Sequence, residues 1–275
     1  MRTLSNRIDR AFDALRRQKR KALIAYLTGG FPTLAATDRA ARNLAAAGVD
    51  LLEIGVPFSD PIADGPTLQY SAHKALENGT TLARLLEWAG RFRRRSSIPL
   101  VFMTYMNPVH RFGVARFAAA ARRAGVDGVI VPDLPLEEAA VLEKPLAAAG
   151  LALIHLVAPT TPPARRARIA ARTRGFLYAV SLTGVTGARA ALPRDLEAFV
   201  RDVKRRSPAP VAVGFGISTP AAAARVARVA DGVIVGSALV QRLRDRRPLL
   251  PFVRSLRRAL DGAPSSFYRG GPHGR

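Results

Sequence analysis

The feature that most constrains the fold is a regular alternation of short apolar segments with longer segments of helical periodicity. Eight short segments rich in apolar and β-branched residues are predicted strands: residues 23–28, 50–54, 99–103, 128–131, 152–157, 176–181, 211–213 and 232–235. Apolar residues at helical spacing predict helices between them, for example at residues 34–47, 114–124, 136–149, 162–172, 196–206 and 220–229. Strands that alternate with helices form right-handed βαβ units and a parallel sheet. Eight such units in about 250 residues predict an α/β fold, the (β/α)8 TIM barrel.

The same pattern indicates the domain organisation. Residues 3–18 carry apolar residues at helical spacing and predict an extra N-terminal helix. Residues 262–275 are rich in Gly, Pro and Arg, which predicts a disordered C-terminal tail. No linker divides residues 1–261, so we predict a single barrel domain there. A doubly wound open sheet is the alternative, although no Gly-x-Gly-x-x-Gly sequence opens a helix.

The charge of the chain first suggests a nucleic-acid partner. The 275 residues include 43 Lys and Arg against 20 Asp and Glu, a formal net charge of +23, which is typical of proteins that bind nucleic acid. The basic residues, however, are nearly all arginine and form short clusters in every part of the chain. We therefore interpret them as a coating of helix surfaces and predict no nucleic-acid partner. A nucleic-acid-binding barrel is kept as the alternative hypothesis.

Several classes of protein are excluded by what the sequence lacks. The chain has no cysteine, which excludes disulfides, Cys-ligated zinc, iron–sulfur clusters and thiol catalysis. No run of 18 apolar residues could span a membrane, and Met1 is not followed by the apolar segment of a signal peptide. We expect no membrane association and a cytoplasmic location.

A carboxyl group in the second predicted strand is the first candidate for catalysis. Glu53 lies among apolar residues, and burial of a carboxyl group tends to raise its pKa. A carboxyl group with a raised pKa is suited to general acid–base chemistry near neutral pH. The alternative is a Glu53 that faces outward and pairs with an arginine. Asp60 and Asp64 follow in a loop stiffened by Pro and Gly, where turn capping is the ordinary role of an aspartate.

Three later loops are suited to bind a phosphate group. They follow the sixth, seventh and eighth predicted strands and comprise residues 183–187, 214–218 and 236–238. Glycines let backbone N–H groups approach an anion, and the helix that follows adds a favourable dipole. The loops after strands 7 and 8 are the usual phosphate site of this architecture. Together they predict a phosphorylated small-molecule substrate.

The residues that the sequence lacks at key positions narrow the possible reaction mechanisms. None of the five lysines lies in a predicted strand, so a Schiff-base aldolase is disfavoured. The four histidines lack the spacing of metal ligands, so we predict no metal site. His155 is interpreted as a packed or surface residue. Acid–base chemistry by carboxyl groups on a phosphate ester is the mechanism that remains.

The motifs around these residues resemble the tryptophan synthase alpha subunit family. Glu53 with the run GVPFSDPIADGP at residues 55–66 is the most specific resemblance. The others are MTYMNP at residues 103–108, VPDLP at 131–135, GVTG at 184–187 and GFGIS at 214–218. The resemblance covers residues 3–260 in order and with the family's spacing. It implies a lyase that cleaves indole-3-glycerol phosphate to indole and glyceraldehyde 3-phosphate by a retro-aldol reaction, in L-tryptophan biosynthesis.

The resemblance also implies a role for each site residue. Glu53 is the expected acid and base, and Asp64 is expected to hold the indole N–H. The residues expected to contact the rest of the substrate are Leu68, Tyr105, Tyr178, Thr186, Phe215 and Ile217. The residues expected to bind the phosphate through N–H groups are Gly187, Gly216, Gly236 and Ser237. Tyr26 stands where family members often carry an apolar aromatic ring, so we leave it out of the indole slot; a buried hydroxyl there needs a hydrogen-bond partner.

A partner and a lid are implied in the same way. Residues 184–193 resemble the family's mobile lid, which closes over the substrate through Thr186. The expected partner is the tryptophan synthase beta subunit, in an α2β2 heterotetramer, and pyridoxal phosphate is expected only in that subunit. Pro57, Asp60, Asn107 and Pro108 lie in loops that correspond to the partner-facing side. A stand-alone lyase that releases free indole shares every catalytic residue and stays open as an alternative.

Overall fold

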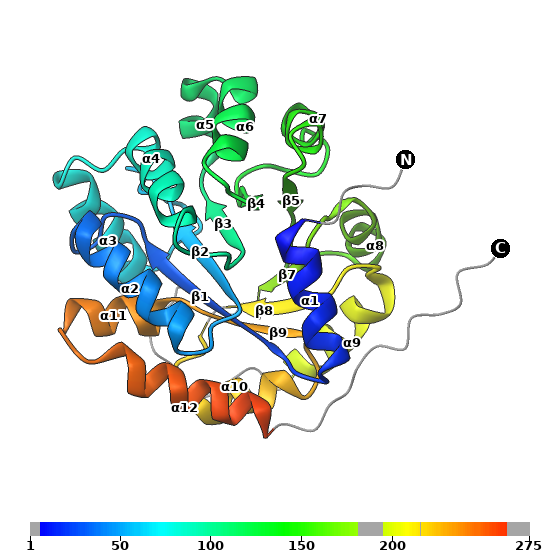
Figure 1. Ribbon diagram of the computed structural model, residues 1–275. Coiled ribbons are helices and arrows are strands. Elements are labelled where there is room, and N and C mark those ends of the chain that lie inside the picture. Colours follow the sequence, from blue (N-terminus) through cyan, green and yellow to red (C-terminus); the bar gives the residue numbers. More distant parts are fainter. Residues whose placement is uncertain (1–5, 181–194, 215, 263–275) are drawn as a thin grey trace.

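The computed structural model describes residues 6–180, 195–214 and 216–262, and within these residues nine parallel strands form a sheet that curls into a barrel (Figure 1). The strands are β1 Ala22–Thr28, β2 Leu51–Gly55, β3 Leu100–Met103, β4 Gly128–Ile130, β5 Ala152–Ile154, β6 Leu156–Val157, β7 Leu177–Val180, β8 Val211–Gly214 and β9 Gly232–Val235. Their order in the sheet is β5-β4-β3-β2-β1-β9-β8-β7-β6. The predicted barrel is confirmed, and the open-sheet alternative is wrong.

The barrel closes through the fifth predicted strand, which the structure divides at His155. Its first half, β5, pairs with β4, and its second half, β6, pairs with β7. The His155 N–H donates to Thr173 Oγ1 (3.1 Å), and the His155 carbonyl accepts from the Tyr178 N–H (3.0 Å). The chain thus stays in the barrel wall as it passes His155. The ninth strand is half of a predicted strand and not an additional element.

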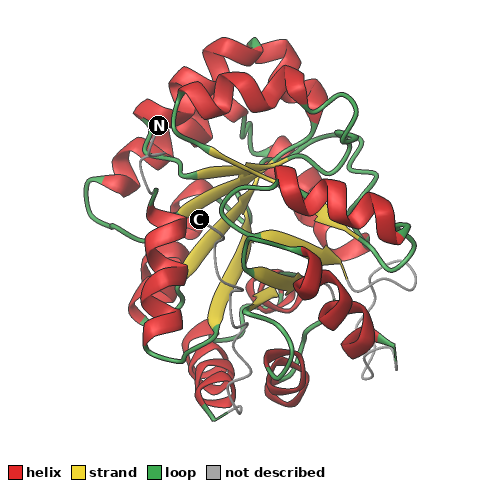
Figure 2. Cartoon of the chain, turned by 90° about the vertical axis from the view of Figure 1, so that its right-hand side faces the viewer, coloured by secondary structure: helices red, strands yellow, loops and turns green. Residues whose placement is uncertain are grey.

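Twelve helices of the described residues surround the barrel (Figure 2). They are α1 Arg7–Arg17, α2 Leu34–Ala46, α3 Pro66–Glu77, α4 Leu82–Arg93, α5 Met106–Phe112, α6 Val114–Arg123, α7 Ala140–Ala148, α8 Pro163–Arg172, α9 Leu196–Arg206, α10 Pro220–Ala227, α11 Ser237–Arg244 and α12 Leu249–Asp261. None of these helices is long and apolar enough to cross a membrane. The helix predicted at 136–149 begins only at Ala140, because the N–H groups of Glu138 and Ala139 bond three residues back in turns.

The extra N-terminal helix is confirmed as α1, and it lies across the end of the barrel where the strands begin. Asn6 caps it and also donates to the Asp127 carbonyl (3.1 Å), just before β4. Ile8 is fully buried, and the Phe12 ring packs 5.8 Å from the Phe176 ring, just before β7. The amphipathic stripe predicted from the sequence is therefore the face that covers this end of the barrel, opposite the strand C-termini.

Three aspartates just before strands fix the register of the barrel. Each lies one or two residues after a Val and is buried or half-buried. Each carboxylate accepts a hydrogen bond from a backbone N–H at the start of a neighbouring strand. The three bonds are Leu23 N–H to Asp50 (2.8 Å), Leu100 N–H to Asp127 (2.9 Å) and Val211 N–H to Asp231 (2.9 Å). Each carboxylate also pairs with a cation, namely Arg257, Arg93 and Lys204 respectively. Charged groups thus tie neighbouring strands together at the end opposite the cavity.

The arginine clusters coincide largely with the last turns of helices. Basic residues occupy the last turn of α4, of α6 and of α9, among others. Cations there interact favourably with the unsatisfied carbonyl groups of the helix C-terminus. This distribution agrees with the interpretation of the positive charge as a coating of helix surfaces.

Candidate active site

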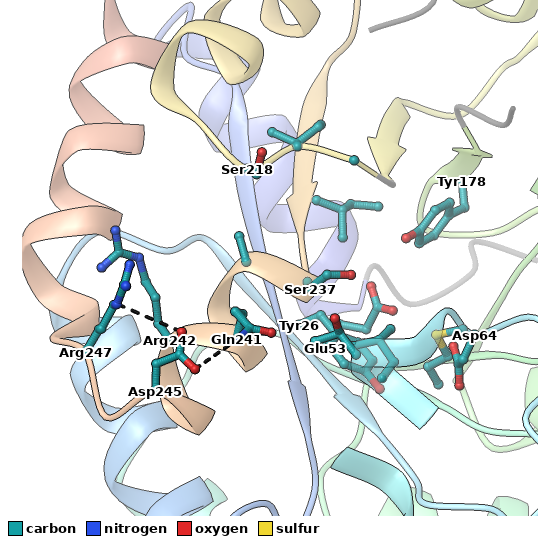
Figure 3. A pocket seen from close by; sticks show the side chains of 18 residues that line it. Tyr26, Glu53, Asp64, Tyr178, Ser218, Ser237, Gln241, Arg242, Asp245 and Arg247 are labelled. Atoms are coloured by element: carbon teal, nitrogen blue, oxygen red, sulfur yellow. Dashed lines mark hydrogen bonds and ion pairs between the residues drawn. The ribbon is translucent and has the colours of Figure 1, made fainter. Parts of the chain in front are cut away.

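A cavity of about 370 Å³ lies at the C-terminal ends of the strands (Figure 3), where this architecture places its active sites. Three carboxyl groups line it: Glu53 and Asp64 on one side, and Asp245 apart from them beside Arg247. The N-terminus of α11 and the loop that leads to α10 line it as well. The cavity therefore brings acid–base groups and backbone N–H groups into one space.

Glu53 projects into the barrel from β2. It lies in register with Tyr26 of β1 and Val101 of β3, and its side chain is 1 % exposed. Its Oε2 atom has no hydrogen-bond partner. Burial, and then the nearby charge of Asp64, raises the pKa of Glu53 to about 8. The predicted inward-facing carboxyl group is thus observed, and the outward-facing glutamate paired with an arginine is not.

Asp64 lies in the loop between β2 and α3, where Gly65 and Pro66 begin the helix. Burial raises the pKa of Asp64 to about 6, although interaction with the Tyr105 hydroxyl acts in the opposite direction. The Tyr105 hydroxyl also accepts a hydrogen bond from the Ala63 N–H (3.1 Å), which fixes the loop. Tyr105 therefore supports the Asp64 loop and is not among the residues that line the cavity.

The opposite side of the cavity offers backbone N–H groups. Gly236 and Ser237 begin α11, and Gly236 caps it without a side-chain hydrogen bond. The first N–H groups of a helix have no acceptor within the helix and form an anion site. Gly216 has a φ of +73°, which favours glycine, and lines the same cavity beside Ile217. These are the predicted phosphate-binding loops that the structure describes.

The walls between the two ends are apolar or aromatic. Leu68, Tyr178 and Ile217 were predicted there and do line the cavity. The Tyr178 hydroxyl points toward the middle of the cavity (Figure 3) and lies over Gly214, where an added Cβ would come within 2.2 Å of it. A side chain at position 214 would therefore displace Tyr178.

Part of the predicted site lies outside the described residues. This holds for Thr186, Gly187 and Phe215, and for the predicted lid at residues 184–193. Their roles stay predictions.

Several lining residues were not predicted. Met103 and Ile234 complete the apolar wall, and Tyr26, which we left out of the indole slot, lies in it beside Glu53. The alternation of inward and outward side chains in β1 was a signal that could have identified Tyr26. The outer rim, which includes Arg242 and Arg247, depends on the path of α11 and of the turn after it, which no local pattern indicates.

The structure places His155 away from this chemistry. It is 7 % exposed, and its Nε2 lies 3.1 Å from Glu143, which in turn pairs with Arg172 (2.6 Å). His155 is therefore a packed residue, as predicted. In the part of the chain that the structure describes, no group of three or more acidic or histidine side chains could hold a metal ion.

Comparison with known proteins adds an independent line of evidence. A sequence model of the family "Tryptophan synthase alpha chain" matches residues 12–250. The tryptophan synthase alpha chain of Citrifermentans bemidjiense is 50% identical over 236 residues, 86% of this chain and 88% of that protein. The one from Chloroflexus aurantiacus is 52% identical over 239 residues, 86% of this chain and 90% of that protein.

Solved structures give the same result. The crystal structure of tryptophan synthase subunit alpha from Legionella pneumophila superposes with a TM-score of 0.86 at 37% identity, over 94% of this chain and 99% of that one. A chain of Mycobacterium tuberculosis tryptophan synthase superposes with a TM-score of 0.86 at 39% identity, over 94% and 99% of the two chains. The similarity extends over nearly the whole of both proteins.

Proposed function

The chain belongs to the tryptophan synthase alpha chain family, and from this premise we propose how its cavity carries out the family's reaction. It is a lyase that cleaves indole-3-glycerol phosphate to indole and glyceraldehyde 3-phosphate, the aldolase half-reaction of tryptophan biosynthesis. The observation that carries the proposed mechanism is that a fully buried carboxyl group, Glu53, and a half-buried one, Asp64, line the same cavity. With pKa values of about 8 and about 6, Glu53 holds a proton at neutral pH while Asp64 is largely charged.

This difference assigns the two roles. Neutral Glu53 donates its proton to C3 of the indole ring, which turns the ring into an electron acceptor. The resulting carboxylate then removes the proton from the glycerol hydroxyl next to the C3–C bond, and the electrons of the breaking bond return to the ring. Charged Asp64 accepts a hydrogen bond from the indole N–H and stabilises the positive charge that develops there. Glu53 first donates one proton and then takes one up, so it ends in its starting state. The proposed steps therefore need no acid or base other than carboxyl groups of this chain.

The rest of the cavity positions the substrate. Leu68, Tyr178 and Ile217 form an apolar slot that suits the indole ring. The N–H groups of Gly216, Gly236 and Ser237 suit the phosphate at the other end. Binding at both ends places the bond that breaks next to Glu53 and supplies the orientation that the reaction requires. The roles that the resemblance implies for Thr186, Gly187 and Phe215 are part of this proposal, and Tyr105 contributes by holding the loop that carries Asp64.

We also propose the beta subunit as partner, in an α2β2 assembly in the cytoplasm, with pyridoxal phosphate in the beta subunit alone. The loop with Pro57 and Asp60 supports this, because Ile62 in the same loop, two residues before Asp64, is 81 % exposed. An exposed large apolar side chain in a loop of this kind is suited to pack against another protein. Asn107 and Pro108 lie in α5, which follows β3 at the same end of the barrel.

The test is a product assay with purified full-length chain, alone and with a tryptophan synthase beta chain. The wild-type chain should release indole and glyceraldehyde 3-phosphate in equal amounts, and faster with the beta chain. Asp64→Asn should lower kcat/KM about 10²-fold or more, because it removes the charge that faces the indole N–H, whereas the exposed Glu138→Gln serves as the matched control. Equal rates for Asp64→Asn and the control would contradict the role of Asp64. Full activity without any response to the beta chain would favour the stand-alone lyase.

A further inference from the structure

The end of the cavity that lies away from Asp64 carries arginine side chains. Arg242 and Arg247 line it there, and among the residues that the structure describes they are the only lysine or arginine side chains in the cavity wall (Figure 3). Arg242 lies in the last turn of α11, and Arg247 lies in the segment between α11 and α12. Neither side chain takes part in the proposed proton transfers, which leaves substrate binding as the role that their position suits.

Arg242 is oriented by contacts with α12 and with the residue before it. Its guanidinium carbon lies 4.2 Å from the centroid of the Phe252 ring, and its Nη1 donates to the carbonyl of Pro248 (3.4 Å). A cation over an aromatic face is attracted by the ring and keeps its charge. Because the ring and the carbonyl are both uncharged, these contacts hold the guanidinium in place without neutralising it.

One carboxylate, Asp245, lies in the same part of the cavity. Its Oδ1 accepts from Gln241 Nε2 (3.0 Å), and its Oδ2 lies 3.9 Å from Arg247 Nε. An ion pair of this length to a side chain that is 68% exposed is weak. Two arginines against one aspartate leave this end of the cavity with a net positive charge, whereas Glu53 and Asp64 line the other end.

The proposed phosphate site lies within reach of this charge. Ser237 begins α11 and Arg242 follows five residues later, so the two are about 8 Å apart along the helix axis. Charges interact over about 8–10 Å at moderate ionic strength before salt screens them. A phosphate ester carries nearly two negative charges at neutral pH. The arginine end of the cavity therefore attracts such a group, and the end with Asp64 repels it.

We propose that Arg242 and Arg247 form a cationic rim that draws the phosphate group of the substrate to the α11 end of the cavity and thereby sets the direction in which the substrate binds. This inference rests on the proposed function, because it takes the substrate to be a phosphate ester that enters this cavity. In the reverse direction, the phosphate would face Glu53 and Asp64. The rim acts on binding and not on the bond that breaks, so its two arginines are specificity-determining residues.

Substitutions at the cationic rim should change substrate binding according to the charge that they remove. Arg242→Gln and Arg247→Gln should each lower kcat/KM for indole release about two- to fivefold at low ionic strength, mainly through a higher KM. Asp245→Asn keeps the Oδ1 atom that Gln241 contacts and removes a negative charge, so kcat/KM should rise by a similar factor. Arg242→Lys keeps the charge and should retain most of the wild-type value, which a role in packing on Phe252 alone would not predict.

The assay measures kcat and KM for indole release by the full chain with a beta chain, at low and at high ionic strength. The differences between variants should shrink at high ionic strength, because salt screens the charges of the rim. Arg244→Gln is the matched control, since it removes the same charge from α11 at a guanidinium that lies 4.4 Å from the Tyr70 ring centroid and does not line the cavity. Equal kcat/KM values for Arg242→Gln, Arg247→Gln and this control, or losses that do not change with salt, overturn the cationic rim.

A second readout does not depend on activity. Calorimetry can measure the affinity of the full chain for glycerol 3-phosphate, which carries the phosphate group, and for indole, which carries no charge. Arg242→Gln and Arg247→Gln should each weaken the binding of glycerol 3-phosphate by about two- to fivefold and leave the binding of indole unchanged. Equal weakening for both ligands overturns the proposal, because it indicates a general change of the cavity. Absence of indole release by the wild-type chain refutes the proposed function instead, and the affinity for glycerol 3-phosphate still decides on the rim.

Discussion

Replacing Glu53 with Gln should lower the cleavage rate about 10²–10⁴-fold and at the same time stabilise the folded chain, by an amount that grows with pH. The reason lies in the burial of Glu53, which raises its pKa from 4.5 to about 8. The folded chain holds this proton up to about pH 8, whereas the unfolded chain releases it near pH 4.5. Glu53 therefore favours the folded state less and less as the pH rises through this window.

The magnitude follows from the same values. One pKa unit corresponds to 1.36 kcal/mol, so the stability contributed by Glu53 should fall by about 3 kcal/mol between pH 5 and pH 7.5. Gln at position 53 cannot ionise, so the variant is free of this loss. Any constant cost of the buried amide is the same at both pH values and cancels in the comparison.

The assay is urea unfolding of the wild-type chain and Glu53→Gln at several pH values from 5 to 8. The difference in the free energy of unfolding should increase in favour of the variant by a slope of about 1.4 kcal/mol per pH unit. Glu138→Gln, which changes an exposed glutamate, should show no such slope. A difference between Glu53→Gln and the wild type that is independent of pH would refute the reasoning that Glu53 is buried as a carboxylic acid.

Three further substitutions test other parts of the structure. Asp127→Asn should lower the free energy of unfolding by about 3 kcal/mol, because it leaves the largely buried Arg93 without its carboxylate; an unchanged urea midpoint would contradict this. Gly90→Ala should raise the free energy of unfolding by about 0.5–1 kcal/mol, since position 90 is inside α4 and the nearest atom to an added Cβ is 3.9 Å away. Gly214→Ala should lower kcat/KM for indole release about tenfold or more by displacing Tyr178, and wild-type kinetics would show that Tyr178 is not positioned by this glycine.

Much of the fold could be predicted because it depends on local patterns. The strand segments are short and apolar, and each is followed by a helical segment, so the order of elements already indicates the barrel. The division of the fifth strand at His155 could not be predicted, since it results from how the two neighbouring strands meet when the barrel closes. The late start of α7 could not be predicted either. The residues before it form turns in which each N–H bonds to the carbonyl three residues back, and their composition does not differ from that of a helix.

Some residues of the candidate site could likewise be predicted from the sequence, and others could not. Glu53 and the glycine loops could be predicted because a carboxyl group in an apolar strand and glycines after strands are visible in the sequence. Tyr26 could not be placed in the cavity wall from the sequence, because the partner that its buried hydroxyl requires, Thr28, comes next to it only in the folded chain. Tyr105 bonds to the loop that carries Asp64 and is not in the cavity wall, which depends on how the loop after β2 packs.

The central claim is that Glu53 is the acid and base that cleaves the substrate. The most direct measurement is single-turnover cleavage of indole-3-glycerol phosphate by Glu53→Gln, with substrate affinity determined on the same sample. Affinity should stay within a few-fold of the wild type, because the phosphate loops and the apolar slot are intact, while the cleavage rate should fall about 10²–10⁴-fold. A cleavage rate close to that of the wild type in a variant that binds substrate normally would contradict the account.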